Sequence, residues 1–287
     1  MKKNPLLKLA AAALFSGVSG VFTDITYDIT SDYVLDADYS ISQIQTVSNG
    51  ATYTIAKSLT NSASGYVLTL SNGKTEILEG GSLLITSANS GIKLDQKSTL
   101  TVDGGKIRAD KITAFNGSTL NLKTANATDS SAITRLIVAG ETTFNMGASQ
   151  TLGLDVRTKL NYNAAAGSLL TVDFVRVDTN GANANIFVEN PDNLAIFFKT
   201  GNDFANVYSF DSDTGRLFIT STEYGYDVKS MTFSFRNGGS ALTGLSFTAV
   251  EGGYMLQSVP EPAEWAAVFG AAALALALRS KTKNLRR

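Results

Sequence analysis

Four short stretches of related sequence decide the fold: S-T-L-T-V at residues 98–102, S-T-L-N-L at 118–122, T-T-F-N-M at 142–146 and T-K-L-N-Y at 158–162. Each begins with a small hydroxyl residue and then alternates polar and apolar side chains. Such alternation is typical of a β-strand with one buried face. The stretches start 20, 24 and 16 residues apart, and this spacing indicates the coils of a β-solenoid.

Two close variants, both G-S-L-L, occur at residues 81–84 and 167–170. In a solenoid, each coil buries its inward side chains against the next coil. A β-sandwich is the alternative, because its strands also recur every ~8–12 residues. The spacing favours a solenoid for residues 35–180.

Residues 22–259 as a whole are rich in alternating Thr, Ser, Val, Ile and Leu. Helical periodicity is hard to find there, so we expect an all-β body with a β-solenoid-like region at residues 21–189. Asn-Gly pairs mark turns between short strands. These pairs lie at residues 49–50, 72–73, 116–117, 180–181 and 237–238.

Aromatic residues become dense after Val188. We expect a β-rich cap or small sandwich at residues 190–258, because an open solenoid end would expose edge strands and core. The aromatic cluster is most simply the hydrophobic core of this cap. A sugar-stacking surface is the alternative interpretation.

The chain of 287 residues contains neither cysteine nor histidine. Without cysteine there is no disulfide framework and no thiolate metal site. Without histidine, the Ser-His-Asp and Cys-His catalytic arrangements and the usual zinc ligands are excluded. We therefore expect a protein that is not an enzyme and that carries no cofactor.

The net charge of −1 hides an uneven distribution. Eight of the 24 basic residues and only two of the 25 acidic residues lie in the two ends of the sequence, which leaves 16 basic and 23 acidic residues in the body. An acidic body without a basic patch argues against a nucleic acid as partner.

Residues 211–215, D-S-D-T-G, supply a weak candidate metal site in Asp211 and Asp213. Calcium takes about six to eight oxygen ligands, and no further acids follow in the next residues. Aspartic proteases also contain Asp-Thr-Gly, but they need two such carboxylates, and this sequence has one. A hairpin turn is the interpretation we prefer.

A second weak candidate consists of acids on neighbouring expected coils together with one cation. Some β-helical polysaccharide-degrading enzymes work with carboxylates and a cation alone. The simpler interpretation is a turn followed by a solvated strand face. The residues concerned are Asp95, Asp103, Asp110 and Arg108.

The first 20 residues predict a secretory signal peptide. Lys2, Lys3 and Lys8 form its charged part, residues 9–15 its apolar part, and residues 16–20 supply small residues before the cleavage point. An uncleaved N-terminal helix is the alternative.

Residues 259–287 have three parts. Val259, Pro260, Glu261 and Pro262 form a stiff, non-helical stretch. An apolar run at residues 265–278 follows, with Trp265, Val268, Phe269, Leu274, Leu276 and Leu278 as its membrane-anchoring side chains. The basic tail consists of Arg279, Lys281, Lys283, Arg286 and Arg287.

A helix of this apolar run would be ~21 Å long, against ~30 Å of hydrocarbon. A buried core helix is therefore the alternative to a transmembrane helix. The adjoining cations favour the membrane, with the basic tail on the cytoplasmic side.

These three parts resemble a PEP-CTERM sorting signal, the C-terminal tag of exported proteins in certain Gram-negative bacteria. The resemblance covers residues 259–287, and the cations are spread out instead of forming one tight cluster. It implies recognition by an exosortase, a membrane protease or transpeptidase that acts near Pro-Glu-Pro. It also implies transient residence in the inner membrane, later release or transfer to the cell surface, and a link to exopolysaccharide or biofilm.

We therefore expect an exported structural protein of the cell surface or extracellular matrix, which meets the Sec translocon and signal peptidase on its way out. The alternatives are a carbohydrate-binding or polysaccharide-degrading β-helix protein, and an adhesin. A groove of acids and aromatics would favour the carbohydrate alternative, whereas a uniform Ser, Thr and Asn coat would favour the structural role.

Overall fold

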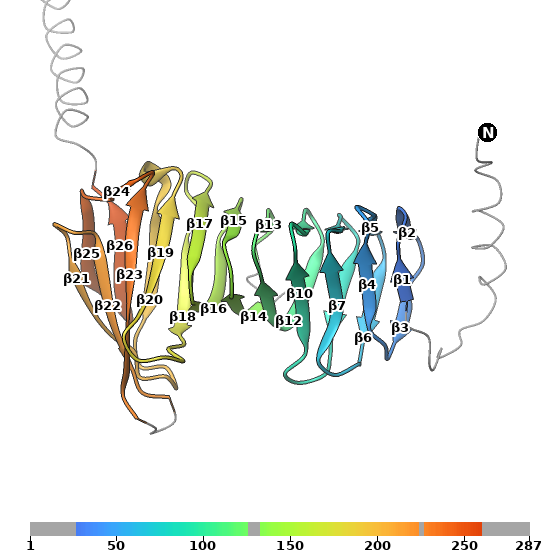
Figure 1. Cartoon of the computed structure of the whole chain (residues 1–287), viewed down its shortest axis with the longest axis horizontal. Coiled ribbons are helices and arrows are strands. Elements are labelled where there is room, and N and C mark those ends of the chain that lie inside the picture. Colours follow the sequence, from blue (N-terminus) through green and yellow to red (C-terminus); the bar gives the residue numbers. More distant parts are fainter. Residues whose placement is uncertain (1–26, 126–132, 224–226, 260–287) are drawn as a thin grey trace, which may run out of the picture.

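The computed structural model describes residues 27–125, 133–223 and 227–259, and these residues wind into a β-solenoid (Figure 1). Strands of successive coils pair in parallel along the whole stack, from β1 with β4 to β19 with β23. A sandwich of hairpins would instead pair neighbouring strands antiparallel. The predicted all-β solenoid is therefore confirmed.

Two long sheets form the sides of the solenoid. Sheet 1 contains, in spatial order, β1 (Tyr27–Ile29), β4 (Gln45–Ser48), β7 (Tyr66–Ser71), β10 (Gly91–Asp95), β12 (Lys106–Ala114), β14 (Ile133–Val138), β16 (Gln150–Val156), β18 (Leu170–Val175), β20 (Ala195–Lys199), β26 (Gly253–Ser258) and β25 (Leu245–Val250). Sheet 2 contains β2 (Tyr33–Leu35), β5 (Thr52–Ile55), β8 (Lys74–Ile77), β11 (Thr99–Val102), β13 (Ser118–Leu122), β15 (Thr142–Met146), β17 (Lys159–Ala164), β19 (Ala182–Val188), β23 (Lys229–Asn237), β22 (Arg216–Ser221) and β21 (Val207–Asp211), with β24 (Ser240–Ala241) paired to β23.

The first coils have a third side, formed by β3 (Tyr39–Ile41), β6 (Ser58–Asn61) and β9 (Ser82–Ile85). Strand β12 ends this side, because its first half pairs with β9 and its second half pairs with β10 in sheet 1. From β14 to β19, each described coil contributes one strand to each sheet. The cross-section therefore changes from three sides to two along the stack.

The register of sheet 2 corrects one part of the sequence repeat. Thr99 pairs with Thr119, and Ser118 pairs with Thr142, as the first three stretches predict. Thr142, however, pairs with Leu160 and not with Thr158. A slip of two residues keeps every side chain on the same face of the strand, so the alternation pattern cannot detect it.

Inward side chains form ladders that run through the solenoid. On sheet 2, Leu100, Leu120, Phe144 and Tyr162 follow one another in register, and each is at most 1% exposed. Sheet 1 supplies the opposing ladder of Ile92, Ile112, Leu136 and Leu154. Each such side chain contributes about 1.5–3 kcal/mol through its removal from water, and one hydrophobic core joins the coils.

Antiparallel strands close the far end of the stack, inside the region where we expected a cap. Strand β20 still pairs in parallel with β18, and β23 with β19, so both sheets continue beyond residue 190. The hairpins β21–β22 and β25–β26 are then added antiparallel to these sheets. The short 3-10 helix η1 (Pro191–Asn193) lies between β19 and β20.

Most of the described aromatics after Val188 pack in the core of this end, as expected, whereas Phe218 is exposed. Phe198, Phe233 and Phe235 are at most 1% exposed. Around them, the ring centroids of Phe198 and Tyr208 lie 5.3 Å apart, and those of Phe247 and Tyr254 lie 4.9 Å apart. Aromatic side chains bury large apolar areas, which suits the end of a stack that no further coil covers.

Close stacking of the coils requires glycine at some corners. A Cβ on Gly81 would lie 2.0 Å from the carbonyl oxygen of Ile55 in the preceding coil, and one on Gly105 would lie 2.6 Å from that of Leu78. Neither contact can be relieved by a side-chain rotation, because both partners are backbone atoms. These glycines therefore set how closely two coils approach.

We expect the inward and outward positions of one strand to differ sharply in their effect on stability. Leu120→Ala should lower the free energy of unfolding of the full chain by about 2–5 kcal/mol, because it leaves a cavity in the ladder. Thr119→Ala, on the outward side of the same strand, should change it by less than about 0.5 kcal/mol. Chemical denaturation measures both, and equal losses would contradict the assigned register.

We expect Gly81→Ala to destabilise the full chain by about 1–3 kcal/mol, because the added methyl group forces two coils apart. The matched control is Gly239→Ala, since a Cβ on Gly239 would meet nothing within 4 Å. Thermal unfolding should show a lower midpoint for the first variant and an unchanged midpoint for the second. A similar effect in both would refute the close contact at Gly81.

Candidate functional site

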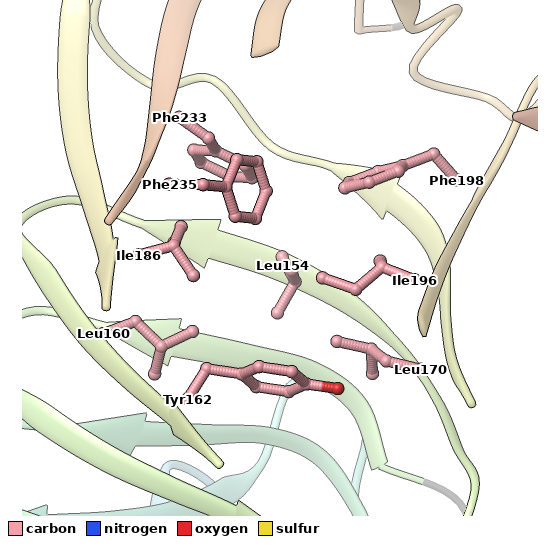
Figure 2. Close-up of a pocket in the computed structure, with 9 residues that line it drawn as sticks. All are labelled: Leu154, Leu160, Tyr162, Leu170, Ile186, Ile196, Phe198, Phe233 and Phe235. Atoms are coloured by element: carbon pink, nitrogen blue, oxygen red, sulfur yellow. The ribbon is translucent and has the colours of Figure 1, made fainter. Parts of the chain in front are cut away.

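The junction between the two-sided coils and the antiparallel end encloses a small apolar cavity (Figure 2). Phe233 and Phe235 lie on one side and Tyr162 on the other, with Leu154 between them. The cavity measures about 10 Å³, at the lower limit of the ~10–15 Å³ that one water molecule needs. It is a packing defect of the core and not a ligand site.

Tyr162 is the one lining residue of this cavity with a polar side-chain atom. Its hydroxyl lies 3.9 Å from the sulfur of Met146, to which it donates. Burial raises the pKa of the Tyr162 phenol, because the charged form is disfavoured away from water.

A network of acids and arginines follows β16 and β18. The Asp155 carboxylate, 3% exposed, receives two hydrogen bonds from Arg157, Nε to Oδ1 at 3.0 Å and Nη2 to Oδ2 at 2.8 Å. Arg157 also contacts Asp178 at 2.6 Å, and Asp178 contacts Arg176 at 2.7 Å. The hydrogen bond that Arg157 donates to Asp155 is the largest cause of the raised pKa of Arg157.

This geometry is that of a structural ion network. Both oxygens of Asp155 are occupied by one guanidinium in a bidentate pair. Arg157 in turn bridges to Asp178, so the acids are neutralised by the arginines that hold them. Neither Asp155 nor Asp178 lines the small apolar cavity.

The structure places Asp211 at the end of β21 and Asp213 in the hairpin turn between β21 and β22. Asp211 Oδ1 accepts from the backbone N–H of Asp213 at 3.0 Å, and Oδ2 accepts from the Thr214 hydroxyl at 2.6 Å. The hydrogen bond from Thr214 is the largest cause of the lowered pKa of Asp211. Its oxygens thus hold the turn together, as the hairpin interpretation predicts.

The other acids singled out in the sequence lie on different parts of the solenoid. Asp95, in β10 of sheet 1, pairs with Lys93 at 2.9 Å. Asp103 follows β11 of sheet 2 and pairs with Lys123 at 2.8 Å. Asp110 lies within β12 and accepts from the backbone N–H of Asn89. Within the described ranges, no three acids come together as a metal site would need.

Several predicted elements lie outside the described residues. They are the signal peptide at residues 1–20 and the tail from Pro260 to Arg287, including the Pro-Glu-Pro stretch, the apolar run and the basic residues. Among the residues that the structure does describe, no helix has the length and apolar character needed to cross a membrane.

The outward side of sheet 2 carries two columns of threonine and asparagine, which we name the Thr/Asn face. One column runs through Thr99, Thr119, Thr143 and Asn161 in register. The second runs parallel to it through Thr101, Asn121, Asn145 and Asn163. All eight side chains are half-buried, so these four coils present a regular surface of hydroxyl and amide groups.

Hydrogen bonds link the second column along the stack. Asn121 donates from Nδ2 to Thr101 Oγ1 at 3.0 Å, and Asn145 donates from Nδ2 to Asn121 Oδ1 at 2.8 Å. Beyond them, Asn190 donates from Nδ2 to Asn163 Oδ1 at 2.7 Å. Neighbouring strands lie ~4.8 Å apart, so equivalent amides repeat at that distance.

An open groove of about 570 Å³ runs along this column. Asn121, Asn145, Asn163, Asn190 and Asn193 supply its amides. Gly147, Ala164 and Ala165 line it with small residues, and Lys123 is its single charged lining residue. We define these residues as the asparagine groove, and it is the candidate functional site.

Sequence reasoning noticed the pattern but missed the site. Asn121 and Asn145 are the fourth residues of two repeat stretches. The alternation pattern predicts only that they face solvent. Asn163 was missed because the fourth stretch was aligned two residues early, which placed Asn161 in line with Asn145. Asn190 and Asn193 come from the turn and 3-10 helix after β19, and no repeat signal marks them.

No protein-family model, curated protein or solved structure matches this chain.

We expect Arg157 and Arg176 to differ in their contribution to stability. Arg157→Ala should lower the free energy of unfolding by about 3–5 kcal/mol, because it leaves the buried Asp155 carboxylate without its partner. Arg176→Ala should cost less than about 1 kcal/mol, because its partners Asp178 and Glu223 are 34% and 29% exposed. Chemical denaturation measures the free energy of unfolding of both variants. A small decrease for Arg157→Ala would show that the buried Asp155 carboxylate does not need Arg157 as its partner.

Proposed function

We propose that this chain is an exported structural protein of the cell surface or extracellular matrix. The observation that supports this most is the Thr/Asn face, a regular surface of hydroxyl and amide groups over four coils. Such groups hydrate well and carry no charge. A repeating, weakly interacting surface suits a stiff element in a matrix better than it suits a site of chemistry.

The pairing of surface charges gives further support. Glu141 beside the Thr/Asn face accepts from Lys159 at 2.7 Å and from Asn161 at 3.2 Å. The hydrogen bond from Lys159 is the largest cause of the lowered pKa of Glu141. Lys199 similarly pairs with Asp173 at 2.5 Å. Both carboxylates are therefore paired with neighbouring lysines.

The proposed route of export depends on the sequence ends. The signal peptide starts translocation through the Sec translocon and is removed by signal peptidase. The apolar run from Trp265 to Leu278 then stops translocation, and the basic tail holds its end in the cytoplasm. An exosortase-type membrane protease cleaves near Pro260-Glu261-Pro262 and frees the body from the inner membrane to the cell surface or the medium.

The last described residues are compatible with this cleavage. Strand β26 ends at Ser258, and the Val259 N–H donates to the Gly244 carbonyl at 2.8 Å. The folded body thus extends to the residue before Pro260. Cleavage within the Pro-Glu-Pro stretch would release the body with both sheets intact.

We expect intact mass spectrometry of the native protein from envelope and medium to show a species that begins near residue 21 and ends near Pro262. A variant with Pro260→Ala, Glu261→Ala and Pro262→Ala should keep its tail through Arg287 and stay in the inner membrane. Ala263→Gly, outside the Pro-Glu-Pro stretch, is the matched control. A native species that retains Arg287 would contradict the sorting proposal.

A further inference from the structure

We propose that the asparagine groove binds an uncharged polysaccharide chain that lies along the solenoid axis. This inference rests on the proposed function, because it names the class of matrix partner that an exported solenoid would meet. It adds a site, an orientation and a charge preference, which the export route does not supply. The hydrogen-bonding capacity, the charge and the shape of the groove each support this inference.

The amide column has unused hydrogen-bonding capacity in the middle of the groove. Asn145 and Asn163 are register neighbours on β15 and β17. Among the described residues, however, no hydrogen bond joins these two amides, although both are bonded to their outer neighbours. The side-chain oxygen Oδ1 of Asn145 and the side-chain nitrogen Nδ2 of Asn163 are therefore left as an acceptor and a donor on adjacent coils.

Adjacent hydroxyl groups of a sugar ring complement such a pair. One hydroxyl donates to the carbonyl of Asn145, and its neighbour accepts from the amide of Asn163. A half-buried amide gains from these bonds, because a hydrogen bond contributes more once bulk water is displaced from around it. The coil spacing of ~4.8 Å is close to the advance per ring of an extended pyranose chain, so successive rings can meet successive coils.

The charge of the groove favours an uncharged ligand. Lys123, its only charged lining residue, donates to Asp103 Oδ2 at 2.8 Å, and this hydrogen bond raises the pKa of the Lys123 ammonium. The cation is thus matched by an acid at the edge of the groove. An anionic chain would find no unpaired cation among the lining residues.

The shape of the groove favours a polymer over a small molecule. Its volume of about 570 Å³ is within the ~300–1,000 Å³ range of ligand sites, but those sites are mostly apolar and enclosing. This groove is open instead of enclosing, its amides lie among small apolar side chains, and it follows the stacking direction of β13, β15 and β17. A chain can therefore enter at one end and leave at the other.

Hydrogen bonding, and not ring stacking, is the expected mode of recognition. Phe187, on the same outward face, pairs in register with Asn161. The ammonium of Lys159 lies 4.6 Å from the centre of its ring, so that cation covers a face a sugar would stack on. Phe187 does not line the groove.

The test is titration calorimetry of the purified full chain with cellohexaose and laminarihexaose as neutral probes and an alginate hexamer as anionic probe. At least one neutral hexamer should bind, and the alginate hexamer should bind at least about tenfold more weakly. Asn145→Ala with Asn163→Ala should weaken the neutral hexamer by about tenfold or more, because two hydrogen bonds are lost.

A second variant tests the groove without changing any asparagine of the amide column. Ala165→Trp leaves every asparagine in place but fills the groove at an exposed position, and it should abolish binding without a change in the thermal midpoint. Asn183→Ala is the matched control, because Asn183 is an exposed asparagine on β19 outside the groove. It should bind as the native chain does.

The outcomes separate this inference from the proposed function. If neither neutral hexamer binds, or if Ala165→Trp binds as well as the native chain, the groove site is refuted, whatever the mass of the exported species. Preferred binding of the alginate hexamer would overturn the charge argument. Self-association of the chain that Ala165→Trp suppresses would assign the groove to a second copy instead of a polysaccharide.

Discussion

Parallel backbone pairing between coils is the constraint on which the rest of the structure depends. Each strand of sheet 2 from β5 to β19 bonds to the strands of the coils before and after it. The pairing fixes the spacing of the coils and stacks equivalent residues in register. Because the chain has no cysteine, the coils are held together by this pairing, by the inward ladders and by side-chain contacts between coils. The corner glycines are a direct consequence, since a Cβ at Gly81 would meet the backbone of the preceding coil.

The same register creates the outward surface. A strand that turns Leu120 and Leu122 inward must turn Thr119 and Asn121 outward, because successive side chains point to opposite faces. Stacking then converts a weak sequence repeat into two continuous columns. The Thr/Asn face is therefore a product of the repeat that builds the core, and core and candidate site cannot be changed independently of the register.

Much of the fold could be predicted because it depends on alternation. The pattern of S-T-L-N-L is enough to predict a half-buried strand, and a spacing near 20 residues is enough to predict a coil. The third side of the first coils could not be predicted, because β3 and β6 are three or four residues long and carry no separate signal. The G-S-L-L stretch at β9 marks a strand but not the side of the coil on which it lies. The slip at Thr158 escaped detection because a shift of two residues preserves the face of every side chain. Asn190 and Asn193 reach the groove only through the path of the chain after β19, which no repeat encodes.

Hydrogen bonding within the amide column affects how a ligand would bind. Asn121 and Asn190 each donate to a neighbour in the column, so much of their side-chain freedom is already lost before any ligand arrives. Ordering a mobile side chain at an interface costs about 0.5–1.5 kcal/mol, and a column that is ordered in advance avoids most of this cost. Each coil offers only a modest contact, but the contacts repeat along one axis. For a chain molecule, every additional engaged coil is an intramolecular event with a high effective concentration. Such a surface would therefore hold a long chain far more tightly than a short one of the same chemistry, which suits the binding of a matrix polymer and not the capture of a free sugar.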